Sequence, residues 1–425
     1  MMPETGQLRD NIARFRLEPA KLACMVAGGF ALAYPAFLAL MFQSHSWIAE
    51  ASGRPGITDF LVLWLAGRSA LHGAAAAAYD PQLLHAAEVA AAGREFTTQL
   101  PWRYPPLFLF VAAALALLPY VQAFLVWICA TLLAFNLAVY KAARSPAGLL
   151  LACATPAVFI NAIGGQNGPL TAALIGAALL NLEKRPVLSG MFFALLSYKP
   201  QFGILVPLVL IAGGYWRALI AATIASGAVI LASTMTFGAG TLHAFLHFLP
   251  ITSNALLLHG ANGFHNLQTV YGLARWAGLG NGAGWVAQGT LIALVAAAIV
   301  WWWRREVPFA LKAASFAAAT LLVTPHLYVY DFAILAVSFA FLWRERPFDA
   351  LELTGIAAAY LCIGAFLFFP TPIGLIAIAI TVGLILRRCL QFEARATTTQ
   401  GFESSGKWFT PRRGDAEGGS LWTMR

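Results

Sequence analysis

The sequence predicts an all-α integral membrane protein, and three observations support this fold class. Hydrophobic residues make up 60% of the 425 residues, charged residues only 11%, and the mean hydropathy is +0.72. A soluble globular chain has about 25% charged residues, so this composition argues against a soluble enzyme. Apolar runs near the ~20 residues that a helix needs to cross a bilayer recur from Leu22 to Leu386. Helices are expected because backbone polar groups in lipid must be satisfied within their own segment.

The first elements follow from charge and length. Residues 1–21 are polar and basic, which predicts a cytoplasmic N-terminal segment. The apolar run 22–42 has no clear small-residue cleavage site after it, so we interpret it as a retained span. Residues 43–104 are then expected to form a long extracytoplasmic loop. Within this loop, residues 59–71 and 86–92 are helix-like but too short to span, so they are predicted to be helices on the membrane surface.

The run 105–140 has Pro119 near its middle and is expected to cross the membrane once, as a bent pass. If it crosses twice, residues 187–214 form one broken span instead. The first option keeps the basic turns on the cytoplasmic side and gives a polytopic bundle of about 12 transmembrane helices. The tail 391–425 is polar and is predicted to be cytoplasmic and disordered. Further spans are expected at 147–162, 169–182, 187–198, 203–214, 218–237, 285–303, 307–323, 328–343, 351–369 and 373–387.

On this topology, polar side chains gather on the extracytoplasmic side, whereas the cytoplasmic turns hold little besides arginine and lysine. Charged groups deep in a membrane cost at least ~2.5 kcal/mol, so those that are retained usually have a task. Asp59 has no basic neighbour three or four residues away that would explain it as a helical salt bridge. A carboxylate at this boundary can act as a general base toward a hydroxyl. The alternative is a helix N-cap.

Several cations are candidates for binding a phosphate. Lys199 stands within a long apolar region, where an ammonium needs an anion, although it can also extend to the interface. Arg68 belongs to the first loop, and Arg103 and Arg275 are weaker candidates. His326 follows Thr324-Pro325 at the end of a span, where its imidazole can donate to a phosphate or accept from a hydroxyl; the alternative is a hydrogen-bonded interface residue. The candidate substrate contacts are Tyr104, Gln166, Asn167, Asn266 and Gln268.

Metal and cofactor chemistry find little support in the sequence. His243 and His247 lie four residues apart in the predicted loop between Phe237 and Trp285, but no HExxH glutamate accompanies them. The five cysteines are scattered without a CxxC pair. We therefore expect no metal and no cofactor. The net charge of +9 is explained by the cytoplasmic ends of spans, so no nucleic-acid partner is expected.

The order of several motifs resembles glycosyltransferase family 87, bacterial membrane proteins similar to the polyprenol-phosphate-mannose-dependent mannosyltransferases. The resemblance covers about residues 20–390 and implies a GT-C-type catalytic domain over residues 22–390, with an acidic residue in the first outer loop. The motifs are Thr58-Asp59-Phe60, Tyr79-Asp80, Tyr104-Pro105-Pro106-Leu107, Gly165-Gln166-Asn167, Tyr198-Lys199-Pro200 and Pro325-His326.

This resemblance implies an enzyme of the bacterial cytoplasmic membrane whose site faces outward. The donor would be a hexose, by default mannose, on a polyprenyl phosphate, and the acceptor a lipid or glycan hydroxyl. Asp59 would be the base, Lys199 would contact the phosphate, and His326 would hold that phosphate or orient the acceptor. One carboxylate suffices for an inverting displacement, unlike the two of glycosidases. The alternative is a lipid or sugar transporter or flippase, which predicts duplicated halves and charges near the midplane.

Overall fold

The computed structural model describes residues 18–97 and 100–404, and all its regular elements within these ranges are helices. Six described helices are long and apolar enough to cross a membrane, or seven if one pair bent by 61°, α7 (Pro146–Cys153) and α8 (Pro156–Gly164), forms one span. This agrees with a polytopic membrane protein, but the expected number of about 12 spans is not confirmed. The six are α2 (Pro19–Gln43), α6 (Tyr120–Ala143), α12 (Trp216–Phe237), α13 with its extension (Ala239–Leu258), α15 (Asn281–Trp303) and Gly374–Arg395 of α19.

The other expected spans are shorter helices. The 15 residues of α16 (Phe309–Val323), for example, extend only about 22 Å, less than the ~30 Å hydrocarbon layer. All residues of α17 (Ala333–Glu345) from Ala333 to Leu342 are buried, whereas α2 buries only Ala27. A helix that protein surrounds need not match the membrane thickness, which explains why apolar runs in the core are short. The remaining short helices are α9 (Gly168–Asn181), α10 (Pro186–Leu195), α11 (Val206–Ala212), α14 (Val270–Trp276) and α18 (Ala350–Ala365).

Two expectations about helix breaks need refinement. The run 105–140 divides into the short η2 (Pro106–Phe108) and α5 (Leu109–Ala116), and then α6, which begins directly after Pro119. The expected loop between Phe237 and Trp285 was wrong in its first part, because Ala239–Leu258 is a 20-residue apolar helix. Its histidines and internal Pro250 interrupt the apolar pattern without interrupting the helix. Its last five residues, Asn254–Leu258, are a π-helix.

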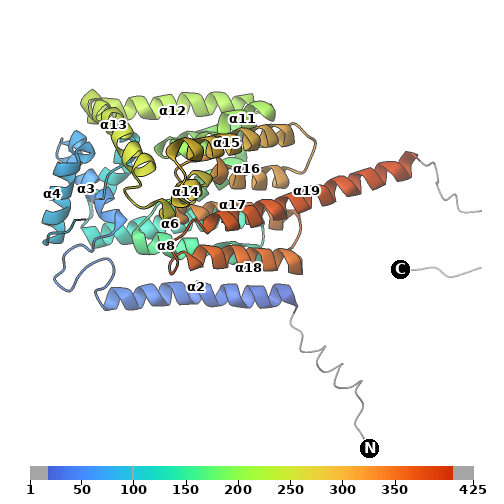
Figure 1. Cartoon of the computed structure of the whole chain (residues 1–425), viewed down its shortest axis with the longest axis horizontal. Coiled ribbons are helices and arrows are strands. Elements are labelled where there is room, and N and C mark those ends of the chain that lie inside the picture. Colours follow the sequence, from blue (N-terminus) through green and yellow to red (C-terminus); the bar gives the residue numbers. More distant parts are fainter. Residues whose placement is uncertain (1–17, 98–99, 405–425) are drawn as a thin grey trace, which may run out of the picture. The chain divides into compact units, whose positions relative to one another are not determined.

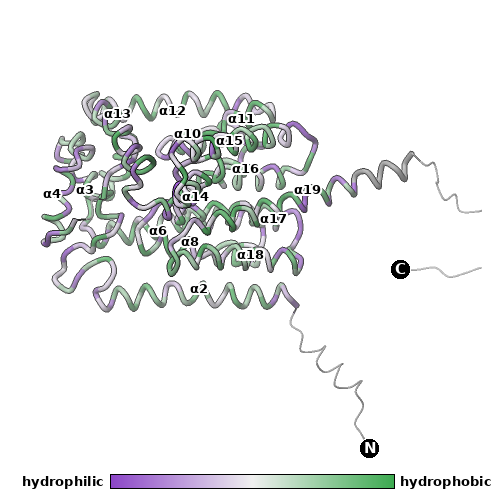
Figure 2. Tube along the Cα trace, viewed as in Figure 1, coloured by the Kyte–Doolittle hydropathy of each residue, from purple (hydrophilic) through white to green (hydrophobic). Residues whose placement is uncertain are grey.

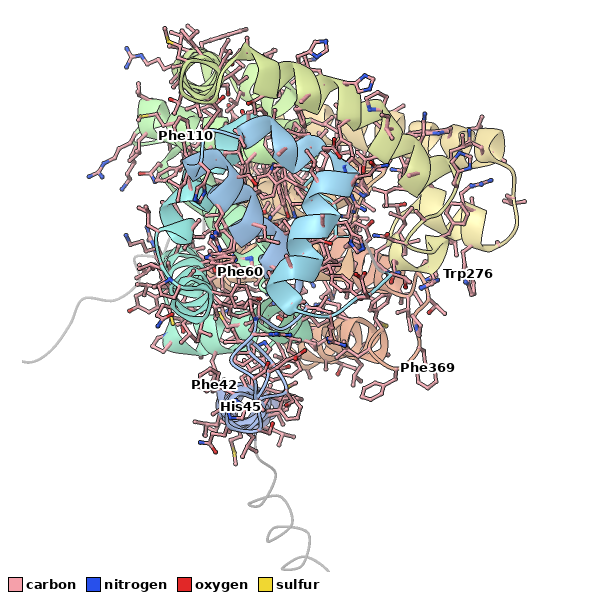
Figure 3. All side chains as sticks on the ribbon, turned by 90° about the vertical axis from the view of Figure 1, so that its left-hand side faces the viewer. Phe42, His45, Phe60, Phe110, Trp276 and Phe369 are labelled. Carbon is pink, nitrogen blue, oxygen red and sulfur yellow. The ribbon has the colours of Figure 1, made fainter. Side chains whose placement is uncertain are left out.

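The first long loop contains α3 (Asp59–Leu71), η1 (Ala75–Tyr79) and α4 (Pro81–Ala92). The helix expected at 59–71 is present, and every residue from Phe60 to Gly67 is buried within the protein; its expected position on the membrane surface stays a prediction. A Cβ on Gly67 would clash with the carbonyl oxygen of Ala112 in α5. Glycine therefore permits a close contact that encloses α3 within protein. Figure 3 looks onto this end of the molecule, with Phe60 near the middle and Phe42 and His45 at the periphery.

Several helices, among them α2, α12, α15 and α18, run in about the same direction, and α3 and α4 lie together at one end of them (Figure 1). Figure 2 shows hydrophobic residues along much of these helices and hydrophilic residues more often in the connecting segments. The chain divides after Ile385 into two units. In the second unit α19 (Gly374–Ser404) continues past residue 391, where a disordered tail was expected. The rest of that tail, 405–425, and most of the expected cytoplasmic segment, 1–17, lie outside the described residues.

Candidate active site

Besides Arg103, six of the other ten candidate residues line one cavity of about 710 Å³. The cavity collects segments that are far apart in the sequence: the start of α3, residues 100–105, the α8–α9 turn, residues 198–201, α13 with the loop after it, and residues 325–331. The structure therefore brings together the polar residues that the sequence assigned to a common side. The six are Asp59, Tyr104, Gln166, Lys199, Asn266 and His326.

Asp59 is the first residue of α3, and its side chain opens onto the cavity. The N-cap position belongs to Thr58, whose hydroxyl lies 2.9 Å from that of Tyr120. Asp59 is therefore not used as an N-cap, which was the alternative to a chemical role. Gln166 Nε2 donates a hydrogen bond to Asp59 Oδ2 at 2.5 Å. Enclosure by protein raises the pKa of Asp59, and the Gln166 hydrogen bond and the charge of Arg103 offset this only in part.

The turn Gly164-Gly165-Gln166 brings Gln166 to Asp59. Gly165 ends α8 in the left-handed region, at φ +67°, which L side chains rarely adopt. A Cβ at Gly165 would also lie 2.5 Å from Phe60 Cβ. Trp127 Nε1 donates to the Gly165 carbonyl at 2.9 Å. The position of Gln166 thus follows from a glycine turn that only a residue without a side chain can make.

Lys199 has a carboxylate partner in the protein itself. Its Nζ donates to Asp331 Oδ1 at 2.7 Å, and the exposed fractions of the two side chains are 6% and 2%. The other oxygen, Oδ2 of Asp331, accepts from the Tyr328 backbone N–H at 3.2 Å. The anion that a buried ammonium needs was expected from a phosphate, but Asp331 already supplies it. In the sequence, Asp331 drew attention only because it stands five residues after His326. Nothing there linked it to Lys199.

Arg103 was a weaker phosphate candidate in the sequence, and the structure places it in the cavity. It lines the cavity, and its Nε is buried without a hydrogen-bond partner among the described residues. No salt bridge involving Arg103 forms within residues 18–97 and 100–404. Its positive charge acts on Asp59, on His326 and on Tyr328, to which it also hydrogen-bonds. The cavity therefore holds a guanidinium with free donor capacity.

His326 is a neutral group in this cavity. Burial, followed by the positive charges of Arg103 and Lys199, lowers the pKa of His326 to about 3. Its Nε2 lies 3.3 Å from the Tyr328 hydroxyl, and the two rings meet edge to face with centroids 5.1 Å apart. The imidazole can donate or accept a hydrogen bond here, but near neutral pH it carries no charge to bind an anion.

Two amide candidates lie behind the cavity wall. Asn167 is buried and donates from Nδ2 to the Tyr104 hydroxyl at 2.6 Å, so it positions a residue that does line the cavity. Gln268 is fully buried, donates to the carbonyl of Thr371 at 3.2 Å and accepts from Gly374 N–H at 2.9 Å. Gln268 therefore joins two backbone segments and does not line the cavity, so its expected contact with substrate stays a prediction.

Two arginine candidates also lie elsewhere. Arg68 is nine residues after Asp59, about 13 Å along α3, and its guanidinium lies 5.0 Å from the Trp64 ring. Arg275 donates to the carbonyls of Leu258 at 3.0 Å and Leu279 at 3.1 Å. Neither of them lines the cavity. For Arg68, membership of the same loop as Asp59 could not predict the distance, because the helix α3 separates the two residues in space.

One positioning residue had no signal in the sequence. Asn161 is completely buried in α8, and its Nδ2 donates to the Tyr330 carbonyl at 2.7 Å. Its Oδ1 accepts from Gly168 N–H at 2.9 Å. A Cβ on Gly168 would clash with the same Tyr330 carbonyl oxygen. Asn161 and Gly168 together hold the segment that carries His326 and Asp331 against α9.

The cavity lining also includes apolar side chains. Four of them, Phe245, Leu249, Leu256 and Leu257, come from α13 and the π-helical turn after it, which also contribute Thr252 and Ser253. The cavity therefore combines polar groups, among them Asp59, Arg103 and His326, with a hydrocarbon surface. Such a cavity suits a ligand that has both an anionic group and an apolar chain.

The family model described as Glycosyltransferase family 87 matches residues 102–325, more than half of the chain. No curated protein and no solved structure matches the chain. The matched range contains four of the six candidate residues that line the cavity, while Asp59 precedes it and His326 follows it directly. This match decides between the two classes that the sequence left open, an enzyme and a transporter. The chain belongs to glycosyltransferase family 87, and with its many apolar helices it is a membrane glycosyltransferase.

Proposed function

We propose that this glycosyltransferase moves a hexose, by family resemblance mannose, from a polyprenyl-phosphate donor to a hydroxyl of an extracytoplasmic lipid or glycan. The enzyme would reside in the bacterial cytoplasmic membrane with its cavity facing outward. The amphipathic cavity supports this donor class. A phosphate and sugar would lie beside the polar groups, and the first isoprenoid units would lie against the apolar side chains of α13.

In the proposed reaction Asp59 is the general base. Its carboxylate takes the proton of the acceptor hydroxyl while that oxygen forms a bond to C1 of the sugar. The bond between C1 and the phosphate oxygen breaks, and its electron pair leaves with the polyprenyl phosphate. The anomeric carbon inverts in this single displacement, so a β-linked donor gives an α-glycoside. The raised pKa of Asp59 makes it a stronger base than an ordinary carboxylate.

The leaving phosphate needs positive charge, and Arg103 is the cation available for it. A guanidinium can give a phosphate two parallel hydrogen bonds, and its buried Nε has no partner among the described residues. Lys199 would act mainly through its pair with Asp331, by fixing the wall on which Tyr330 and His326 stand. His326, being neutral, would contribute a hydrogen bond to the phosphate or to the acceptor.

The observation that carries this proposal is that Asp59 faces a cavity which also contains Arg103 and apolar side chains. The test is transfer of labelled mannose in membranes that contain the wild-type chain or the Asp59→Asn variant, at matched protein abundance. Loss of the base should lower the rate by about 10²–10⁴-fold. The donors compared are polyprenyl-phosphate-mannose and a soluble nucleotide-mannose.

A matched control exists in the same loop. Asp80 caps α4 by accepting from the Gln82 and Leu83 N–H groups at 2.9 and 3.1 Å, and asparagine caps a helix about as well. Asp80→Asn should therefore keep wild-type transfer. A wild-type transfer rate in the Asp59→Asn variant would show that Asp59 is not the general base. Transfer from the nucleotide sugar alone would refute the donor class, and retention of the anomeric configuration in the product would refute single displacement.

A further inference from the structure

A second large hollow, unrelated to the candidate active site, lies between α6, α9 and α10. It is an open groove of about 760 Å³. Most of its lining is apolar and includes Leu137, Leu174 and Phe192, but Lys141, Arg144 and Arg185 line it as well. None of the described residues that line the groove is acidic. It therefore has a hydrocarbon surface and a group of positive charges.

The positive charges are gathered at one end. Lys141 stands in the last turn of α6, Arg144 is its C-cap, and Arg185 is the N-cap of α10. Phe192 lies seven residues into the helix that Arg185 begins, so the apolar part extends about 10 Å from the charges along α10. On α6 the lining reaches back to Ala134, about 15 Å from Arg144. The groove is thus amphipathic along its length. That length, about 15 Å along α6, is near the thickness of one hydrocarbon leaflet.

These cations are available to a ligand. All three are exposed, and none forms a salt bridge within the described part of the chain. A fourth cation, Arg344, lies close enough to Arg144 to feel its charge, and Glu183 acts on Arg344 with the opposite sign. Tyr140, which also lines the groove, is 46% exposed beside Lys141, an arrangement typical of side chains at the headgroup level of a membrane.

The groove and the candidate active site lie at opposite ends of α6. Tyr120, the first residue of α6, hydrogen-bonds to Thr58 next to Asp59. The 24 residues of α6 then extend about 36 Å before reaching the basic end of the groove. One bound donor cannot have its phosphate at both places. Cytoplasmic topology explains basic residues at helix ends, but it does not explain why they line an apolar groove of this size.

We propose that this groove is a binding site for an anionic phospholipid, whose phosphate lies among Lys141, Arg144 and Arg185 and whose acyl chain occupies the apolar part. The apolar faces beside the groove support a lipid of the surrounding leaflet as the occupant, because Leu133, Leu137, Val187 and Met191 are exposed there. The site is separate from the proposed donor cavity and does not depend on the identity of the donor.

The test is native mass spectrometry of the full chain in detergent, titrated with phosphatidylglycerol or phosphatidylcholine. The groove variant is Lys141→Gln/Arg144→Gln/Arg185→Gln, and a charge-matched control is Lys184→Gln/Arg217→Gln/Arg304→Gln, three exposed basic residues outside the groove. The wild type should retain phosphatidylglycerol in preference to phosphatidylcholine. The groove variant should weaken phosphatidylglycerol binding by about 10- to 100-fold, and the control by less than about threefold.

A third variant distinguishes the contribution of the apolar part of the groove from that of its charges. Ala177 lines the groove, so Ala177→Trp should fill it, keep all three cations and still weaken phosphatidylglycerol binding. Equal weakening by the groove and control variants, or unchanged binding to Ala177→Trp, would overturn the proposal. Tighter binding of undecaprenyl phosphate than of phosphatidylglycerol would also overturn it, because the occupant would then be an isoprenoid phosphate.

Discussion

The two aspartates of the candidate active-site cavity are held in opposite ways. Asp59, at the start of α3, exposes its carboxylate to the cavity and is bound by a neutral amide, that of Gln166. Asp331 is buried, and both of its oxygens are occupied, one by the Lys199 ammonium and one by a backbone N–H. Asp331, held by a cation and a backbone donor, is therefore less suited than Asp59 to take a substrate proton. The comparison thus separates a carboxylate suited to chemistry from one that holds structure.

The same distinction applies to the cations. Lys199 is paired inside the wall, whereas Arg103 lies in the cavity with a donor that has no partner among the described residues. Residue type and expected membrane side do not distinguish the two members of either pair. What differs is the number of protein groups that already satisfy each charge.

The largest effect on stability is expected when the Lys199–Asp331 pair is broken. Asp331→Asn leaves a buried ammonium without a counter-charge, which costs about 3–5 kcal/mol. The double variant Lys199→Met/Asp331→Asn removes both charges and should recover most of that loss, because the amide that replaces the carboxylate can still accept from the Tyr328 N–H. Thermal unfolding of the purified variants in detergent measures both effects. A single variant as stable as the wild type would show that the pair is not structural.

The next effect concerns the donor phosphate. Arg103→Gln should raise the dissociation constant of polyprenyl-phosphate-mannose by about 10- to 100-fold, because a charge-assisted hydrogen bond contributes about 1.5–3 kcal/mol. In the double variant Lys199→Met/Asp331→Asn, donor affinity should change much less. A donor-binding titration of both variants separates the two cations. If the double variant loses more affinity than Arg103→Gln, the roles assigned to Lys199 and Arg103 are reversed.

A smaller effect is expected at Gln166, and it depends on pH. Transfer needs the ionised form of Asp59, so the rate should rise with pH through the raised pKa of Asp59 and then level off. The Gln166 hydrogen bond lowers that pKa, so Gln166→Leu should raise it further and move the rising limb to higher pH. On the rising limb the variant should be slower by roughly tenfold, the equivalent of one hydrogen bond to a charged group. Profiles of kcat/KM against pH test this, and a limb that moves to lower pH would contradict it.

The smallest effect is expected at Arg68, which shares the loop and α3 with Asp59 but not the cavity. Its contact with the Trp64 ring contributes about 0.5–1 kcal/mol at an exposed site. Arg68→Gln should therefore keep kcat and donor affinity within about twofold of the wild type. A loss of donor affinity as large as that of Arg103→Gln would mean that Arg68 reaches the donor.

Local sequence signals predicted helix bounds well where an apolar run ends at a proline or a polar residue. The bounds of α3 at Asp59–Leu71 and the break near Pro119 follow from apolar runs and proline. The same signals did not reveal the helix at Ala239–Leu258, because its histidines and Pro250 resemble a loop pattern. Nor could they predict the close packing of α3 on α5, because a glycine at position 67 indicates such a contact only when the partner, Ala112, is known.

The sequence by itself determined that this chain is a helical membrane protein, that Asp59 is its strongest candidate for a base, and that it resembles glycosyltransferase family 87. These conclusions depend on composition, on residue type and on motif order, which can be read along one chain. Only the tertiary structure decided that Lys199 is neutralised by Asp331, 132 positions away, and that Arg103 forms no salt bridge among the described residues. The reason is physical: whether a buried charge is free depends on the partners that distant segments supply.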